Sequence, residues 1–367
     1  MSQGRLAAGV AVWVIAGLAA VCAAQKQSEP PVKPAEIAPK EPAENPGGEP
    51  WLVPTKPLAH VEQRGTGPIP LVLIPGLNCD WTVFEKFMDR NKDRYTMYAI
   101  TLPGFGKSEP PPGTKDYKAA DGEWLNNAEA AVFEMILEHK IESPVVVGHA
   151  MGGLLAIRLI SRHPDVLRSA VSIDGHPAVP LGGPGQPMPI ELRRQIVADS
   201  IVPQFSAMPD EQWKQVSGQL GALVKNTERG RELAAMSQSV PREVGQRYLL
   251  EQLSADASEQ AHSLKKPCLF IIALAQMDSD PSIVAMAREA FTHQYETFED
   301  LTIVYFEDTS HFVMDDAPAE LDRAIEQFVE GKPVEGKKHV EQPAAPGPGG
   351  DAQRPATSGK EAPKEAK

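Results

Sequence analysis

Gly148-His149-Ala150-Met151-Gly152 is the segment of this chain that says most about its fold. It follows a run of three valines, residues 145–147, and precedes an apolar segment with helical spacing. Two glycines separated by three residues are typical of a sharp turn from a buried strand into a helix, because a Cβ at either position would clash. The residue at the centre of such a turn points its side chain clear of the sheet. At that position, Ala150 presents only a methyl group.

Short β-branched runs alternate with helical patterns on both sides of this turn, from residue 70 onward. This alternation is the signature of a mostly parallel α/β sheet covered by helices. We expect strands over residues 71–74, 95–101, 145–147, 170–173, 268–274 and 301–306, with 58–63 as an antiparallel edge strand. We expect helices over residues 81–89, 122–139, 152–162, 281–293 and 318–329.

The alternation stops at Gly175 and resumes at Pro267. Residues 182–185 are rich in glycine, and four helical patterns follow, over 190–205, 210–223, 229–237 and 242–253. So long an all-helical interval is more than a plain connection. We expect a helical cap, residues 176–264, inserted after the strand that ends near Asp174 and lying over the carboxyl ends of the strands, where open α/β sheets place their sites. The alternative is a helical subdomain that does not contact the site.

Both ends of the chain differ in composition from the rest. Residues 1–24 have one positive charge, an apolar run and small residues at the end, which is the layout of a secretory signal peptide. The alternative is an uncleaved anchor formed by residues 6–24, the only case in which a membrane contact is expected. Residues 25–56 and 331–367 are rich in Pro, Glu, Lys and Ala and are expected to be a disordered linker and tail. The sequence therefore predicts an exported protein, periplasmic or secreted, with one folded domain over residues 57–330.

Charge and cysteine content narrow the function classes. A formal net charge of −13 should repel phosphate backbones, which argues against a nucleic-acid partner. Cys79 follows a predicted strand and Cys268 begins one, so the two thiols lie at opposite edges of the sheet and are expected to be free. The chain contains no metal-ligand cluster, phosphate loop or dinucleotide fingerprint, so no cofactor or metal is expected.

Further motifs lie in a fixed order around the glycine pair. The strand 71–74 runs into Pro75-Gly76-Leu77, residues 102–108 read Leu-Pro-Gly-Phe-Gly-Lys-Ser, and Ser310-His311-Phe312 precede a closing helix. Together they resemble the α/β-hydrolase superfamily (AB hydrolase-1 type) over about residues 57–330. Members of that superfamily have Gly-x-Ser-x-Gly at the elbow between strand and helix, with serine as the nucleophile. Here Ala150 stands at the serine position.

The resemblance implies roles for the remaining site residues. His311 occupies the position of the general base. The acid that orients this base should follow the strand 268–274, where Asp278 is the first choice. Asp280 is a close rival, and Asp174 is a third possibility because some members draw the acid from the end of the preceding strand. Each of the three could also be an ordinary loop carboxylate or a helix cap.

The oxyanion hole would consist of two backbone N–H groups, those of Leu77 and Met151. Backbone donors do not depend on the side chain at residue 150, so they survive the replacement of serine. The first hypothesis is therefore a hydrolase of ester or related carbonyl bonds in a small molecule, with water activated by His311. The superfamily has a member with Gly-His-Ala-x-Gly at its elbow, which is a precedent for a hydrolase without the serine. The alternative is a catalytically silent pseudo-hydrolase that binds a small apolar ligand or a partner.

Overall fold

The computed structural model describes residues 54–112, 122–179, 181, 188–258, 261, 264–274, 295 and 298–336. The predicted signal peptide or anchor, most of the linker and of the tail, and the helix predicted over 281–293 lie outside the described residues. None of the helices within the described ranges has the length and apolar character needed to cross a membrane.

A seven-stranded sheet forms the centre of the fold, in the order β1-β3-β2-β4-β5-β6-β7. Only β1 is antiparallel to its neighbour, and the remaining pairs are parallel. The predicted fold class, a mostly parallel sheet with flanking helices and an antiparallel edge strand, is confirmed. The strands are β1 His60–Arg64, β2 Ile69–Ile74, β3 Tyr95–Thr101, β4 Val145–His149, β5 Ser169–Ile173, β6 Cys268–Ala273 and β7 Leu301–Phe306.

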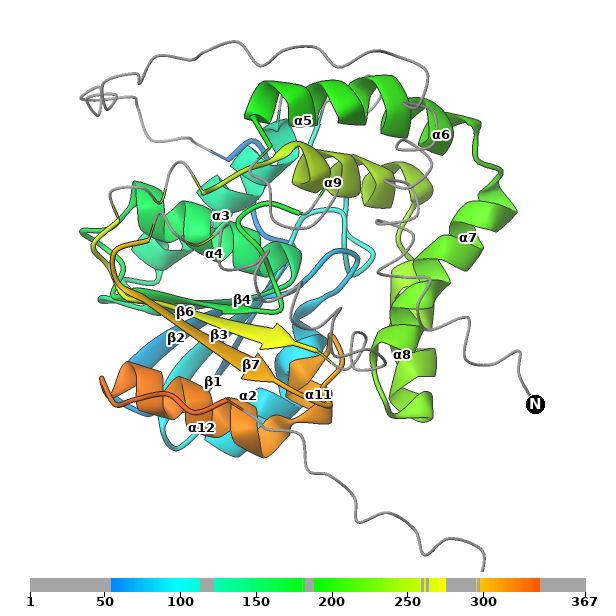
Figure 1. Ribbon diagram of the computed structural model, residues 1–367. Coiled ribbons are helices and arrows are strands. Elements are labelled where there is room, and N and C mark those ends of the chain that lie inside the picture. The colour runs from blue at the N-terminus through cyan, green and yellow to red at the C-terminus, as the bar shows by residue number, and fades with distance from the viewer. Residues whose placement is uncertain are drawn as a thin grey trace, which may run out of the picture.

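Helices cover both faces of this sheet (Figure 1). The two-residue period of a strand divides its side chains between the faces. On β2, Val72 and Ile74 pack with the helices α3 and α4, whereas Leu71 and Leu73 pack with α2 and α12 on the opposite face. The bounds are α2 Glu85–Asn91, preceded by a 3₁₀ turn Trp81–Phe84, α3 Glu123–Glu138, α4 Met151–Arg162, α11 Val313–Asp316 and α12 Pro318–Val329.

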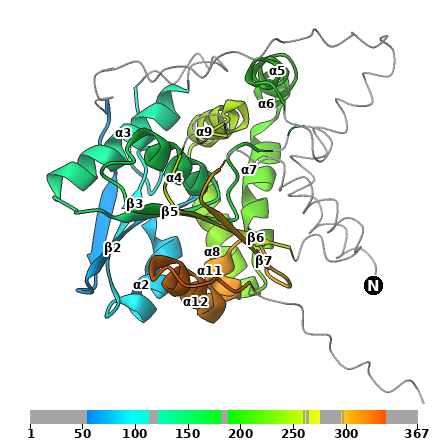
Figure 2. The ribbon, with the colours of Figure 1, turned by 60° about the vertical axis from the view of Figure 1, so that its left-hand side comes forward.

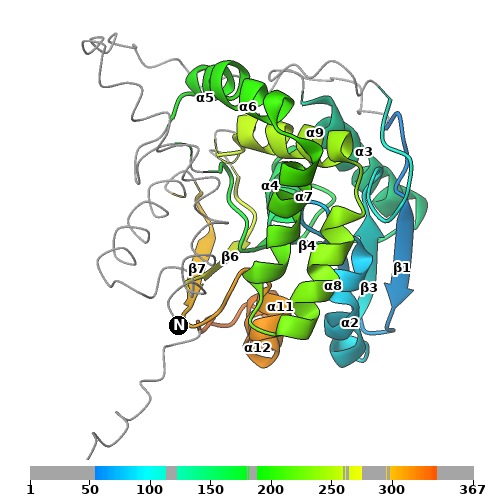
Figure 3. The ribbon, with the colours of Figure 1, turned by 90° about the vertical axis from the view of Figure 1, so that its right-hand side faces the viewer.

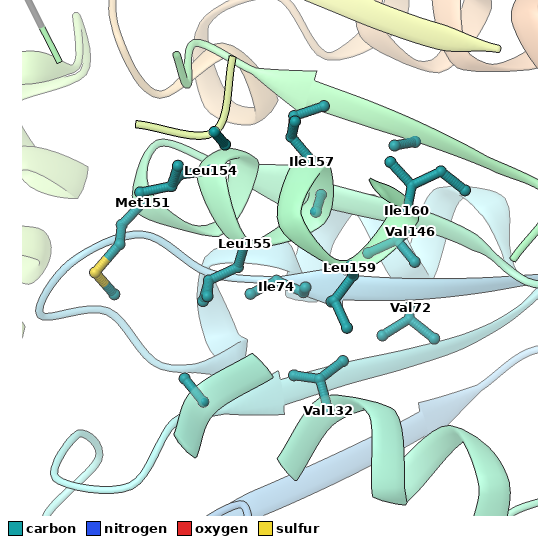
Figure 4. Packing of buried hydrophobic residues seen from close by; sticks show 14 of the residues in the cluster. Val72, Ile74, Val132, Val146, Met151, Leu154, Leu155, Ile157, Leu159 and Ile160 are labelled. Atoms are coloured by element: carbon teal, nitrogen blue, oxygen red, sulfur yellow. The ribbon is translucent and has the colours of Figure 1, made fainter. Parts of the chain in front are cut away.

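Helix α4 begins at the glycine turn and is buried along most of its length. Its apolar side chains lie over the central strands, with Leu155 and Leu159 near Ile74 and Val72 (Figure 4). Such burial fixes the direction of the helix against the sheet. The start of α4, and with it the turn at Ala150, is therefore held by the core.

The interval between β5 and β6 contains only helices within its described residues, as the sequence predicts (Figures 2 and 3). The predicted single helix over 190–205 is interrupted by a π-helical turn, Val197–Ile201. Pro203 explains the interruption, because it has no N–H to donate to the carbonyl of Asp199 four residues earlier. The helices are α5 Ile190–Ile196, α6 Val202–Ala207, α7 Asp210–Gly218, α8 Thr227–Gln238 and α9 Arg242–Ser254.

Helix α9 joins this helical insert to the sheet domain. The carboxylate of Glu251, 1% exposed, accepts hydrogen bonds from the N–H groups of Trp124 and Leu125 in the first turn of α3, both at 2.9 Å. A negative charge is stabilised at a helix N-terminus. The Tyr248 hydroxyl, also buried, donates to the carbonyl of Pro103 in the loop after β3 at 3.0 Å. This end of the insert is therefore fixed by polar contacts as well as by packing.

Helix α8 and the turn before it contact two more loops at the carboxyl ends of strands. Three hydrogen bonds join the parts: Phe312 N to Leu223 O at 3.2 Å, Asn78 Nδ2 to Ser237 Oγ at 3.1 Å and Arg229 Nε to Asp315 Oδ2 at 3.1 Å. The first reaches the loop that follows β7, the second reaches the loop that follows β2, and the third reaches α11, which begins where the β7 loop ends. The insert therefore lies against the edge of the sheet at which the predicted site residues gather.

The Gly148→Ala substitution tests the glycine turn. A Cβ on Gly148 would overlap the backbone carbonyl of Gly152, which the buried helix α4 holds in place. We expect the substitution to lower the free energy of unfolding by more than about 3 kcal/mol, the upper end for overpacked cores. Urea denaturation followed by circular dichroism measures this change.

Gly218→Ala is the matched control, because a Cβ there meets only the far end of the Gln238 side chain. We expect it to change the free energy of unfolding by less than about 1 kcal/mol. Equal costs for the two substitutions would contradict the steric explanation.

Candidate functional site

The turn between β4 and α4 has the conformation that the glycine pattern predicts. Ala150 lies between His149, the last residue of β4, and Met151, the first of α4, with φ 52° and ψ −115°. This backbone conformation is strained for a residue with a Cβ and persists only where the surroundings impose it. The N–H of Ala150 donates to Ile173 O at 2.9 Å, which ties the turn to β5.

The loop after β2 lies directly against this turn. A Cβ built on Gly76 would stand 3.1 Å from the Cβ of Ala150, and one on Gly152 would overlap the carbonyls at the end of β2. Within the described residues, the N–H groups of Leu77 and Met151 pair with no hydrogen-bond acceptor. The two predicted oxyanion donors therefore lie on adjoining segments and are unpaired.

His311 contacts a carboxylate, that of Asp174. Its Nδ1 is 2.6 Å from Asp174 Oδ2. The other carboxylate oxygen, Oδ1, accepts the N–H of Ala273 at 3.0 Å, which fixes the orientation of the acid. Asp174 has φ 47°, in the left-handed region that Asp tolerates better than most residues. The neighbouring Gly175 lets this loop approach Ala150, because a Cβ there would overlap the Ala150 carbonyl.

The electrostatics of the pair follow from this contact. Burial by itself would raise the pKa of Asp174, but the hydrogen bond from His311 and the charge of that ring hold the pKa below its ordinary value of 3.8. Asp174 is therefore ionised near neutral pH and can orient the imidazole. Within the described residues, the remaining ring nitrogen of His311, Nε2, has no partner.

Asp174 was the third of the three acids considered from the sequence. The first choice, Asp278, and its rival, Asp280, lie outside the described residues. Both of the named carboxylate positions after β6 thus remain predictions, and the described contact with His311 is made by Asp174.

Sequence reasoning did not single out His149, which precedes Ala150. This side chain is 1% exposed, and its Nε2 lies 3.0 Å from the backbone carbonyl of His311. Its ring is 4.5 Å from the His311 ring and 4.8 Å from the Phe312 ring, between centroids. Burial, reinforced by the nearby His311, lowers the pKa of His149 to about 3. His149 is therefore neutral at ordinary pH.

A pair of residues that the sequence analysis does not single out, His176 and Tyr295, lies beside Asp174. His176 Nδ1 is 2.8 Å from the hydroxyl of Tyr295. Burial lowers the pKa of His176 below 6.5 and raises the pKa of Tyr295 well above 10, so both groups are neutral near pH 7. One signal in the sequence points to His176: it lies two residues after Asp174, in the loop that follows β5.

Cys79, on the loop after β2, is 1% exposed, and burial raises the pKa of its thiol to about 12. A thiol rather than a thiolate therefore stands there at neutral pH. Cys268 is buried with a thiol pKa of about 12 for the same reason. Both cysteines are free, as predicted. Over the described ranges, no three His, Cys, Asp or Glu side chains are grouped so as to hold a metal ion.

A sequence model of the alpha/beta hydrolase family matches residues 71–324, which is the greater part of the chain. The chain belongs to this family. The match includes the glycine turn and the loops that bear Leu77, Asp174 and His311.

Proteins of named activity are similar to part of this chain. A 2-(acetamidomethylene)succinate hydrolase of Mesorhizobium japonicum is 29% identical over 120 residues, which are 33% of this chain and 40% of that protein. A (lyso)-N-acylphosphatidylethanolamine lipase of Homo sapiens is 30% identical over 125 residues, 34% of either chain. This chain therefore matches less than half the length of these relatives, both of which are hydrolases.

Solved structures show the same fold over a longer span. A hydrolase from Oleispira antarctica superposes with a TM-score of 0.58 at 12% identity, covering 74% of this chain and 94% of that one. The enol-lactonase from Burkholderia xenovorans gives a TM-score of 0.54 at 18% identity, covering 74% and 96%. At these identities the likeness concerns the fold alone.

The buried thiols generate a labelling prediction. The third cysteine of the chain, Cys22, lies in the predicted signal peptide and is removed by a Cys22→Ser substitution. In this variant, we expect neither Cys79 nor Cys268 to react with iodoacetamide in the native state, because each is buried and protonated. Both should react after unfolding in urea, and mass spectrometry counts the adducts. Rapid labelling of Cys79 in the native protein would contradict its place in the core.

The low pKa of His149 generates a stability prediction. The unfolded chain binds a proton at this residue below about pH 6.5, whereas the folded chain does so only near pH 3. The contribution of His149 is therefore complete above pH 6.5 and decreases as the pH falls towards 3, with a slope of up to about 1.4 kcal/mol per pH unit. Urea titrations from pH 7 to pH 4 should show a shallower decline in the free energy of unfolding for His149→Gln than for the native chain. Parallel declines would refute this assignment.

Proposed function

We propose that this protein is an exported hydrolase of an ester or related carbonyl bond in a small molecule, with water as nucleophile in place of serine. The observation on which the proposal rests is the 2.6 Å contact between His311 and Asp174 beside a turn whose central residue, Ala150, has no hydroxyl. Such a base and acid are needed for proton transfer and not for simple ligand binding.

In the proposed reaction His311 Nε2 removes a proton from a water molecule in the space above Ala150. The water oxygen attacks the substrate carbonyl carbon, and the oxyanion that forms accepts hydrogen bonds from the N–H groups of Leu77 and Met151. When the intermediate collapses, the bond to the leaving group breaks and His311 returns its proton to that group. No covalent enzyme intermediate is formed.

Asp174 supports this role of His311 in two ways. Its hydrogen bond at Nδ1 selects the tautomer with Nε2 unprotonated, and its charge stabilises the imidazolium that forms after proton transfer. The predicted acids Asp278 and Asp280 would have to perform the same function from the segment after β6. We therefore assign the acid to Asp174 in the proposal and keep the other two as variants in the test.

The helical insert is proposed to shape the substrate pocket. Its contacts with the loops that follow β2 and β7 support this, because those loops border the turn at Ala150. Export is proposed from the apolar run and small residues within 1–24.

The test measures hydrolysis of p-nitrophenyl acetate, a labile ester that suits a weak nucleophile. We expect linear product formation without a burst in the native protein, because no acyl-enzyme accumulates. His311→Gln and Asp174→Asn should each lower kcat/KM by about 10²- to 10⁴-fold, the usual contribution of an oriented general base. Asp278→Asn and Asp280→Asn should leave kcat/KM close to that of the native protein.

The Ala150→Ser variant provides the comparison with covalent chemistry. It restores a hydroxyl at the centre of an intact turn, so we expect a burst of nitrophenol of about one equivalent, followed by a steady rate. If Ala150→Ser is active and the native protein is not, water activation is refuted and the alternative, a silent site that binds a ligand, is favoured. Activity that survives His311→Gln would refute the assignment of the base.

A further inference from the structure

His149 is buried against His311, and its hydrogen bond determines its tautomer. A backbone carbonyl only accepts hydrogen bonds, so the 3.0 Å contact requires a proton on His149 Nε2. Burial and the low pKa keep the ring neutral, so Nδ1 is unprotonated. Nδ1 is itself buried and has no partner within the described residues.

An unpaired buried acceptor costs free energy, and an apolar side chain in the same place would avoid that cost. The surrounding ring contacts, with His311 and Phe312, would be available to a phenylalanine as well. The one thing that His149 adds is a donor to the carbonyl of His311. The polar side chain is thus explained by this hydrogen bond rather than by packing.

His311 has an unusual need for such support. In a serine hydrolase the base is held at Nδ1 by the acid and at Nε2 by the serine hydroxyl. Here Asp174 holds Nδ1, but residue 150 is alanine and Nε2 has no partner within the described residues. The imidazole is therefore missing one of the two hydrogen bonds that would fix its position.

We propose that His149 is a positioning residue for His311, with its Nε2–H fixing the His311 backbone and its ring supporting the imidazole that no serine hydroxyl holds. The inference rests on the proposed function for the role of His311 as base, but the geometry that it concerns can be measured without turnover. His149 acts on His311 and does not touch the reacting atoms.

The experiment compares His149→Gln with His149→Met, two side chains of nearly equal size. Glutamine Nε2 can donate to the His311 carbonyl, and methionine has no donor. The first readout is the downfield proton resonance of His311 Nδ1–H in its hydrogen bond to Asp174, assigned by its loss in Asp174→Asn. We expect this resonance in the native protein and in His149→Gln, and its loss or broadening in His149→Met.

The second readout is steady-state hydrolysis of p-nitrophenyl acetate. Misplacement of a catalytic group can cost up to about 10²-fold in rate, so we expect His149→Met to lower kcat by about 10- to 100-fold with KM unchanged, and His149→Gln to recover most of it. His163→Met is the control: this histidine stacks on Phe133 at 3.6 Å, at the other end of α4. It should lower thermal stability and leave the resonance and kcat unchanged.

Several outcomes would overturn the inference. Retention of both the resonance and kcat in His149→Met would do so, as would equal losses in the Met and Gln variants. The ¹⁵N shifts of His149 in the native protein give a test that needs no variant, because a proton on Nδ1 rather than Nε2 excludes the hydrogen bond. If the resonance responds as expected but the native protein shows no turnover, the positioning role stands and the proposed hydrolysis fails. If the native protein shows turnover but the resonance does not respond to the His149 substitutions, the proposed hydrolysis stands and the positioning role fails.

Discussion

Backbone segments approach one another at Gly148 and Gly152 more closely than any side chain would allow. A Cβ on Gly148 would overlap the start of α4, and a Cβ on Gly152 would overlap the end of β2. This approach forces the sharp turn at Ala150 and its positive φ. The same approach brings the loop after β2 beside the first N–H of α4, and neither this N–H nor that of Leu77 has an acceptor in the part of the chain that the structure describes. The rest of the site is arranged around this contact, which requires no side chain at all.

The base and the acid reach the turn from the same side of β4, but from strands at different distances from it. Asp174 follows β5, which pairs with β4, whereas His311 follows β7 at the edge of the sheet. The chain must therefore bring the last loop back across β6 before the pair can form. The contacts of α8 with Asp315, and of the turn before α8 with Phe312, hold it in place. The geometry of the candidate site thus depends on the insert as well as on the strands.

The sequence predicted those parts of the structure that follow from local pattern. Valine runs, glycine spacing and the 3.6-residue period located the strands, the turn and most of the helices. The choice of acid could not be made this way, since aspartates follow two strands and only the folded chain shows that Asp174 meets His311. His149 was missed because a residue that continues a valine strand is expected to be core, and its hydrogen bond joins positions 162 residues apart. The π-helical turn was missed because Pro203 lies where a helix period otherwise continues.

The insert is attached unevenly. Its α8 and α9 contribute side chains to the cores on the two faces of the sheet, through Leu233 and Tyr248. Its α5 to α7 form a separate apolar cluster that closes mainly on itself and on α9, with Phe205 and Trp213 at its centre. Natural variation or laboratory evolution can therefore rebuild α5 to α7 with little disturbance of the sheet. Changes in α8 or α9 would be transmitted to the loops around Ala150. One continuous insert therefore contains a part that can vary, α5 to α7, and a part that is constrained by its contacts, α8 and α9.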